Sequence, residues 1–177
     1  MSLIVEDGTV VAGAESYCSV ATATTYHANR GNAAWASLPL TMMEQCLRKA
    51  TDYMVGAYRL RWKGTRTSPT QVLDWPRAGV FTEPVLYGRD LNGMAYAFPT
   101  NVVPSEVQQA CAEFALRSSS ADLASDLSQQ VVREQVGQIS IEYDKGSPEY
   151  ARYRAVDLRL KAYLRNNAGI MAKVIRS

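Results

Sequence analysis

Apolar residues recur at helical spacing in three long stretches of the chain. The clearest runs from 41 to 58, where they repeat every three or four residues at Met43, Cys46, Leu47, Ala50, Tyr53, Met54 and Ala57. Because Thr41 and Glu44 have the spacing of a capping box, we expect this helix to begin at Thr41. The second stripe spans 104–117, opens at Pro104 and ends near Ser118, and consists of Val107, Ala110, Cys111, Phe114 and Ala115. The third spans 147–166 and consists of Tyr153, Val156, Leu160, Tyr163 and Leu164.

Two weaker patterns complete the expected secondary structure. Ser19 can cap a short helix over 19–30, which Gly31 would end in a left-handed conformation. Ile139, Ile141 and Tyr143 alternate with polar residues, which indicates a β-hairpin over 131–143. The fold class is therefore mainly α: a small bundle of about four helices with a short β-hairpin and a long, aromatic-rich extended loop. We expect one domain over 1–166 and a C-terminal tail over 167–177.

The long loop spans 59–103 and is rich in glycine, proline and aromatic residues. Loops beyond roughly 15 residues are uncommon in compact domains unless they are functional, and this one is about three times that length, which predicts a function for it. A basic and aromatic cluster at its start comprises Arg59, Arg61, Trp62, Lys63, Arg66, Trp75 and Arg77. Such residues serve both protein interfaces and single-stranded nucleic acid binding. We expect an arm that faces a neighbouring subunit or partner through Arg61, Trp62, Lys63, Arg66, Trp75 and Arg77; the alternative is that both tryptophans cap the chain's own core.

Net charge argues against binding nucleic acid by bulk electrostatics. The 177 residues carry a formal charge of +2, and 47% of them are hydrophobic, as in a globular protein. The charge is segregated, because residues 59–77 and 145–177 are basic and residues 101–144 are acidic. Identical subunits could use this complementarity in a head-to-tail ring, although solvated helix faces would give the same pattern. No run is long and apolar enough for a membrane span, and the chain begins without a secretion signal, so we expect a cytosolic protein without a membrane partner.

No residue pattern predicts catalysis or a cofactor. Cys18, Cys46 and Cys111 are widely spaced, which favours reduced thiols. Cys46 and Cys111 fall on the apolar faces of two predicted helices, where a free cysteine behaves as a small hydrophobic residue. His27 is the single histidine, so neither a histidine-containing zinc site nor a histidine-dependent triad is indicated. Phosphate-binding and nucleophile-elbow motifs are absent from the sequence. We therefore expect a protein that is not an enzyme and holds no metal or cofactor.

The C-terminal tail combines apolar and basic residues. Four sizeable apolar side chains lie within the last eight residues and are unfavourable in water, so we expect the tail to dock. It could fold back on the chain's own helices or insert into a groove of a partner or an adjacent subunit. The docking residues in either case are Ile170, Met171, Lys173, Val174, Ile175 and Arg176.

Several segments resemble a family of tailed-phage proteins. They include Val5-Glu6-Asp7-Gly8-Thr9, Ala14-Glu15-Ser16-Tyr17, Arg48-Lys49-Ala50-Thr51-Asp52-Tyr53, Trp62-Lys63-Gly64, Leu73-Asp74-Trp75-Pro76-Arg77 and Val103-Pro104. That family often carries the label DnaT-like single-stranded DNA-binding, and its size and layout are similar to the head-to-tail adaptor, or head-completion, proteins of long-tailed phages. The resemblance covers most of residues 1–150.

The resemblance implies two functions. As an adaptor, the chain would form a ring, expected to be twelve-fold, in the virion neck after synthesis in the host cytoplasm. It would bind the portal protein and a tail-side neck protein, either a stopper or a tail terminator, and double-stranded DNA would pass through the lumen without sequence-specific contacts. The DnaT-like label implies direct binding of single-stranded DNA instead. The balanced charge and segregated blocks favour the adaptor, and an enzyme or regulatory domain without a readable motif stays a third possibility.

Overall fold

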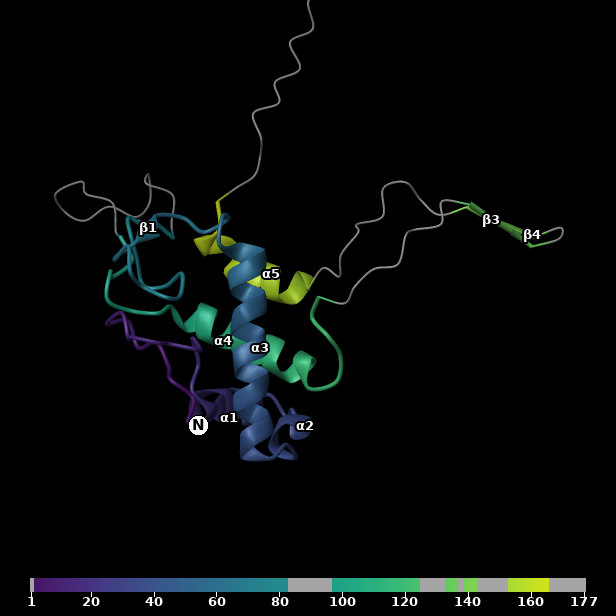
Figure 1. Ribbon diagram of the computed structural model, residues 1–177, viewed down its shortest axis with the longest axis horizontal. Helices are drawn as coiled ribbons and strands as arrows, with labels where there is room; N and C mark the ends of the chain where they lie inside the picture. Colours follow the sequence, from purple (N-terminus) through teal and green to yellow (C-terminus); the bar gives the residue numbers. More distant parts are fainter. Residues whose placement is uncertain (1, 83–96, 125–132, 137–138, 143–152, 166–177) are drawn as a thin grey trace, which may run out of the picture.

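Helix α3 (Leu40–Tyr58) is the longest element and the one on which much of the fold is assembled. In the computed structural model it crosses α4 (Ser105–Ser118), and these two helices make the most extensive contact between elements (Figure 1). The structure describes residues 2–82, 97–124, 133–136, 139–142 and 153–165. In this part the expected helical architecture is confirmed.

Most of the predicted apolar stripe of α3 is buried, with Tyr53 and Ala57 half-buried, but its predicted capping box is wrong. Met43, Cys46, Leu47, Ala50 and Met54 all face the core. The helix begins at Leu40, with Pro39 as its N-cap and no side-chain cap bond. The Pro39 carbonyl accepts the Met43 amide at 3.0 Å, so the chain enters the helix one residue before Thr41.

Of the two N-terminal helices, α1 packs against α3 and α4, and α2 packs against α1. Helix α1 (Val20–Ala28) is capped as predicted, because the Ser19 side chain accepts the Thr22 amide at 3.0 Å. It ends before the predicted Arg30, and Gly31 follows with a φ of +69°. The short helix α2 (Ala33–Ala36), which the sequence did not predict, buries Trp35.

Helix α4 agrees with its predicted range and stripe. Pro104 is its N-cap, and its end at Ser118 coincides with the run of three serines. These serines end the helix by bonding backwards: the Ser118, Ser119 and Ser120 hydroxyls donate to carbonyls three residues earlier. These hydroxyls compete with backbone amides for the last carbonyl groups of the helix, which explains why the helix does not continue.

The last helix is shorter than predicted. Helix α5 (Arg154–Leu160) is followed by the 3₁₀ helix η1 (Lys161–Tyr163), and Tyr153 is already non-helical. Val156, Leu160, Tyr163 and Leu164 of the predicted stripe are buried. The proposed opening at 147–149 lies outside the described residues.

Two small antiparallel ribbons form the described β-structure. Strand β1 (Thr65–Arg66) pairs with β2 (Arg77–Ala78) inside the long loop. Strand β3 (Arg133–Val136) pairs with β4 (Ile139–Glu142), so the predicted hairpin is confirmed.

The core spans the whole helical body and includes part of the long loop. Its largest fully buried side chains are Trp35, Trp62, Trp75, Tyr17 and Phe114. All three cysteines are free and buried, as expected for Cys46 and Cys111. Among the described residues, no helix is long and apolar enough to cross a membrane, and no group of three or more His, Cys, Asp or Glu side chains could hold a metal ion.

Candidate nucleic-acid interface

Two basic segments that are far apart in the sequence meet at one end of the molecule. Arg61 and Lys63 follow α3, whereas Lys161 and Arg165 lie in and after η1. The Arg165 amide donates to the Arg61 carbonyl at 2.7 Å, and the Lys63 amide donates to the Tyr163 carbonyl at 2.9 Å. These antiparallel contacts, centred on the bridge between Trp62 and Leu164, fix the two segments side by side.

Lys63 ties a third segment to this junction. Its ammonium donates to the Ala162 carbonyl at 2.8 Å and to the Phe81 carbonyl at 3.0 Å. The residue therefore holds η1 and the end of the first described part of the loop together, and its own charge is partly engaged in doing so.

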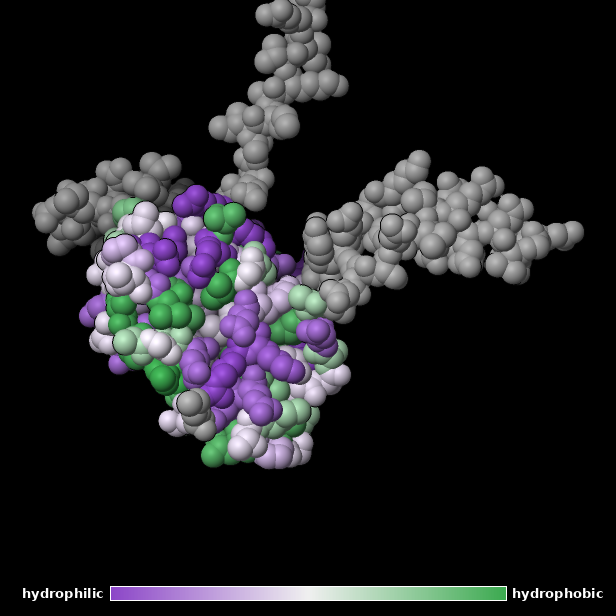
Figure 2. Space-filling model, in the orientation of Figure 1, coloured by the Kyte–Doolittle hydropathy of each residue, from purple (hydrophilic) through white to green (hydrophobic). Residues whose placement is uncertain are grey.

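Four cations point outward around the junction, and we call them the basic end: Arg61, Arg66, Lys161 and Arg165. Arg66 adjoins the junction because it pairs with Arg77 across the β1–β2 ribbon, and the Arg77 guanidinium donates to the Lys63 and Gly64 carbonyls. In Figures 1 and 2 this end lies at the top of the view, where α3 finishes and much of the surface is hydrophilic.

The charges of the basic end are only partly compensated within the described residues. Arg61 lies over the Tyr58 ring and 3.8 Å from the Asp157 carboxylate, yet its side chain is 44% exposed. Arg66 donates to the Gln71 carbonyl at 3.1 Å and keeps further guanidinium N–H groups. Lys161 and Arg165 make no ion pair with any described residue. Phosphate groups could therefore bind here without displacing strong internal partners.

Trp62 and Trp75, the aromatic half of the predicted arm, are fully buried in the chain's own core. Their rings meet edge to face at 5.7 Å, and Trp75 makes the same kind of contact with Tyr163 and Phe98. The structure thus shows the alternative that the sequence left open for these residues. They offer no exposed face on which a base could stack.

Arg77 is also buried and organises the loop from inside. Its guanidinium donates to the carbonyls of Lys63, Gly64 and Asp74 at 2.7–3.1 Å. Arg59 points outward but is paired with the buried Asp74 carboxylate at 3.0 Å. Of the six predicted arm residues, only Arg61, Lys63 and Arg66 remain accessible to a ligand.

The sequence-based prediction missed Lys161 and Arg165. Their signal was present in the basic block at 145–177, but nothing in the spacing indicated that this block would pair with residues 61–63. The predicted docking residues of the tail, Ile170, Met171, Lys173, Val174, Ile175 and Arg176, lie outside the described residues.

Comparison with known proteins gives one match. The family model described as "Putative DnaT-like ssDNA binding protein" matches residues 1–177. No curated protein and no solved structure matches the chain.

Proposed function

We propose that this chain, which belongs to the DnaT-like family, binds single-stranded DNA through its basic end. The observation that supports this most directly is the junction of two distant basic segments, which brings Arg61 next to the segment of Lys161 and Arg165. Arg66 lies on the adjoining β1–β2 ribbon. Cations that neutralise phosphates release counterions, and this supplies most of the affinity of sequence-independent binding.

Base stacking would contribute little to such binding. Phe81 is the exposed aromatic ring tied to this region, and it is 38% exposed. Because Trp62 and Trp75 are buried, phosphate contacts rather than a row of aromatic platforms would provide the affinity. We therefore expect binding that depends strongly on salt and weakly on base sequence.

The test measures the affinity of the full-length chain for a labelled thymidine 20-mer by fluorescence anisotropy. Replacing Lys161 and Arg165 together with alanine should weaken binding at least tenfold. The control replaces Lys49 and Arg154, two exposed cations away from the junction, and should change affinity less than threefold. Equal losses in both variants, or no binding by the unaltered chain, would contradict the proposal.

A head-to-tail adaptor is the second candidate. The family description names no virion role, so the adaptor rests on the resemblance of the sequence segments described above. The burial of Trp62 and Trp75 is compatible with the adaptor function, because a surface with cations but few exposed aromatic rings suits contact with the phosphates of double-stranded DNA in a lumen. The partners would be a portal protein, a tail-side neck protein and further copies of the chain.

A mass measurement of the native assembly, with and without a portal protein, tests this second function. An adaptor would form a ring, expected to be twelve-fold, or join a portal. A chain that stays monomeric in both conditions and prefers single strands to duplex DNA would leave only the first function.

A further inference from the structure

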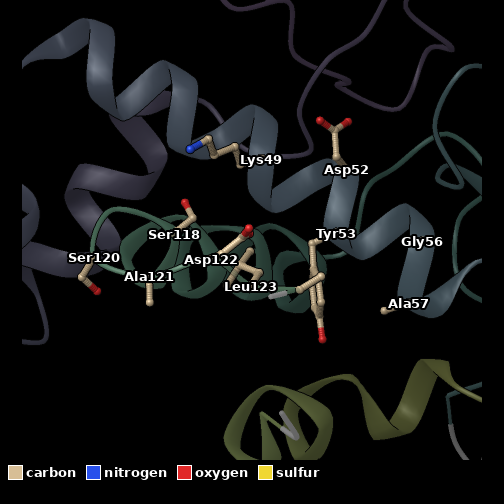
Figure 3. Close-up of a pocket in the computed structure, with 11 residues that line it drawn as sticks. Lys49, Asp52, Tyr53, Gly56, Ala57, Ser118, Ser120, Ala121, Asp122 and Leu123 are labelled. Atoms are coloured by element: carbon tan, nitrogen blue, oxygen red, sulfur yellow. The ribbon is translucent and has the colours of Figure 1, made fainter. Parts of the chain in front are cut away.

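A groove of about 830 Å³ lies between α3 and the segment that follows α4. One wall is formed by residues 49–57 of α3, and the other is the 118–124 segment (Figure 3). Its size is in the range of cavities that take ligands. Nothing in the proposed DNA site uses this groove.

The α3 wall of the groove combines small residues with one aromatic ring. Gly56 is exposed, and a Cβ added to it would meet nothing within 4 Å, so there is room above this turn of the helix. Tyr53, one turn earlier, packs against Phe114 and Tyr153, with ring centroids 4.9 and 5.6 Å apart. Together with Ala57, Gly56 and Tyr53 form an apolar surface that another segment can approach closely.

Charged side chains line the groove on both sides. Lys49 and Asp52 lie on α3, and Asp122 lies on the segment opposite (Figure 3). All three residues are exposed, and none of them forms an ion pair within the described part of the chain. Two carboxylates and one ammonium give the groove a net negative charge, so it favours a basic occupant.

Two segments that lie largely outside the described residues are candidates to cover the groove, and their charges differ. The 125–152 segment carries five acidic and three basic residues. The C-terminal tail over 167–177 carries Lys173 and Arg176 and no acidic residue. Charge complementarity therefore favours the tail.

The tail also starts near one end of the groove. The Trp62 amide donates to the carbonyl four residues earlier at 3.2 Å, so helical geometry continues to Trp62, about 8 Å beyond Ala57. Leu164 pairs with Trp62, which places Arg165 within roughly 16 Å of Ala57. The five peptide steps from Arg165 to Ile170 span up to about 17 Å. The first apolar residue of the tail therefore reaches the groove of its own subunit.

The apolar residues of the tail have a spacing that suits this surface. Ile170 and Val174 are four residues apart, as are Met171 and Ile175, and this spacing would place all four on one face of a helix. Amphipathic helices bind to grooves through such a face. As a helix, seven residues from Ile170 would extend about 10 Å, and the α3 wall is roughly 12 Å long. The tail and the groove thus match in length as well as in charge.

We infer that the C-terminal tail folds back into the groove of its own subunit. Its apolar residues cover Tyr53, Gly56 and Ala57, and its two cations approach Asp52 and Asp122. A short tether gives the tail an effective concentration on the order of millimolar at its own groove, which exceeds the concentration of a second copy in solution. The inference does not depend on DNA binding.

Cross-linking within the full-length chain tests where the tail lies. A short bismaleimide should cross-link at least half of the Gly56→Cys/Ile170→Cys protein at the mass of one subunit, because the three native cysteines are buried. The matched control is Leu158→Cys/Ile170→Cys. Leu158 is 60% exposed on α5 and lies seven residues before Arg165, but it does not line the groove. The control should cross-link at least fivefold less. Equal yields, or a main product with the mass of two subunits, would overturn the inference.

Maleimide labelling of Gly56→Cys alone measures how well the tail covers the groove. Adding Ile170→Asp and Val174→Asp should raise the labelling rate at least fivefold, because carboxylates oppose burial against an apolar surface. The same two changes should leave the labelling rate of Leu158→Cys unaltered. With the native tail, the slow rate at position 56 should be the same at 1 and 100 μM protein. A rate that is insensitive to the tail, or protection that appears only at the higher concentration, would overturn the inference.

Discussion

His27 is held as a neutral imidazole between α1 and α4. Its Nε2–H donates to the Ala112 carbonyl at 3.0 Å, so its Nδ1 is the acceptor of the Asn32 amide at 3.0 Å. Burial lowers the pKa of His27 below its ordinary value of 6.5. The Ala112 hydrogen bond acts in the opposite direction but does not outweigh burial.

This depressed pKa predicts a pH dependence of stability. Well above pH 6.5, His27 is neutral in both the folded and the unfolded chain, so it causes no loss of stability there. As the pH falls below 6.5, the unfolded chain takes up a proton before the folded chain does, so the free energy of unfolding decreases by about 1.4 kcal/mol per unit of pKa difference. Urea unfolding at pH 7.5 and 5.5 measures the loss. His27→Gln keeps a donor for Ala112 and should lose less; an equal loss in both proteins would assign the effect to other groups.

Trp62 offers a second prediction at the residue scale. Because its side chain is fully buried against Tyr58 and Trp75, Trp62→Ala should lower the free energy of unfolding by about 3–5 kcal/mol. Leu60 is 88% exposed two residues earlier, so Leu60→Ala should change it by less than about 0.5 kcal/mol. Chemical denaturation measures both. A Trp62→Ala protein that keeps its stability but no longer associates would instead support an intersubunit arm.

At the scale of elements, the long loop is held to the body by backbone geometry as well as by aromatic burial. Gly64 and Gly79 flank the β1–β2 ribbon, and both have a φ near +65°, where residues with a Cβ are strained. They differ in their surroundings. A Cβ on Gly64 would collide with the Ala78 carbonyl, whereas a Cβ on Gly79 meets nothing within 4 Å.

These surroundings predict different costs for the same substitution. Gly79→Ala should lower stability by the cost of the left-handed conformation, roughly 1–2 kcal/mol. Gly64→Ala should lower it further and separate β1 from β2, because backbone must move to relieve the collision. Thermal unfolding compares the stability of the two variants. Equal losses of stability would contradict the prediction, because they would show that the β1–β2 ribbon accommodates a Cβ at position 64 without further destabilisation.

The helices could be predicted from the sequence because their signals are local. The stripe from Met43 to Met54 follows from helical spacing alone, and the end of α4 follows from Ser118 and its neighbours. The burial of Trp62 and Trp75 could not be predicted in this way. An aromatic ring in a loop is compatible with a core and with an interface. Trp62 and Trp75 are buried because Tyr163 and Leu164, from a segment about 100 residues later, contact them.

The candidate site was predictable only in part for the same reason. Arg61, Lys63 and Arg66 were identified from one basic segment. Arg77 has the same residue type and lies in the same segment, but three backbone carbonyls and its burial make it structural. Lys161 and Arg165 became part of the site through backbone pairing with Arg61 and Lys63, which residue type does not encode.

For the whole molecule, the basic end predicts how salt affects DNA binding. Four outward cations correspond to a slope of about −3 for the logarithm of the binding constant against the logarithm of salt concentration, at about −0.7 per phosphate neutralised in single strands. Removing Lys161 and Arg165 should reduce the slope by about 1.4. Anisotropy titrations between 50 and 300 mM NaCl measure it. An unchanged slope in the variant would place the phosphate contacts elsewhere.

Amide hydrogen exchange of the full-length chain, with and without a thymidine 20-mer, tests most directly whether single-stranded DNA binds at the basic end. The account predicts slower exchange at 61–66 and 161–165 in the complex, with α1 and residues 49–57 of α3 unchanged. Protection confined to other segments, or exchange that the oligonucleotide does not alter at a concentration where anisotropy shows binding, would contradict it.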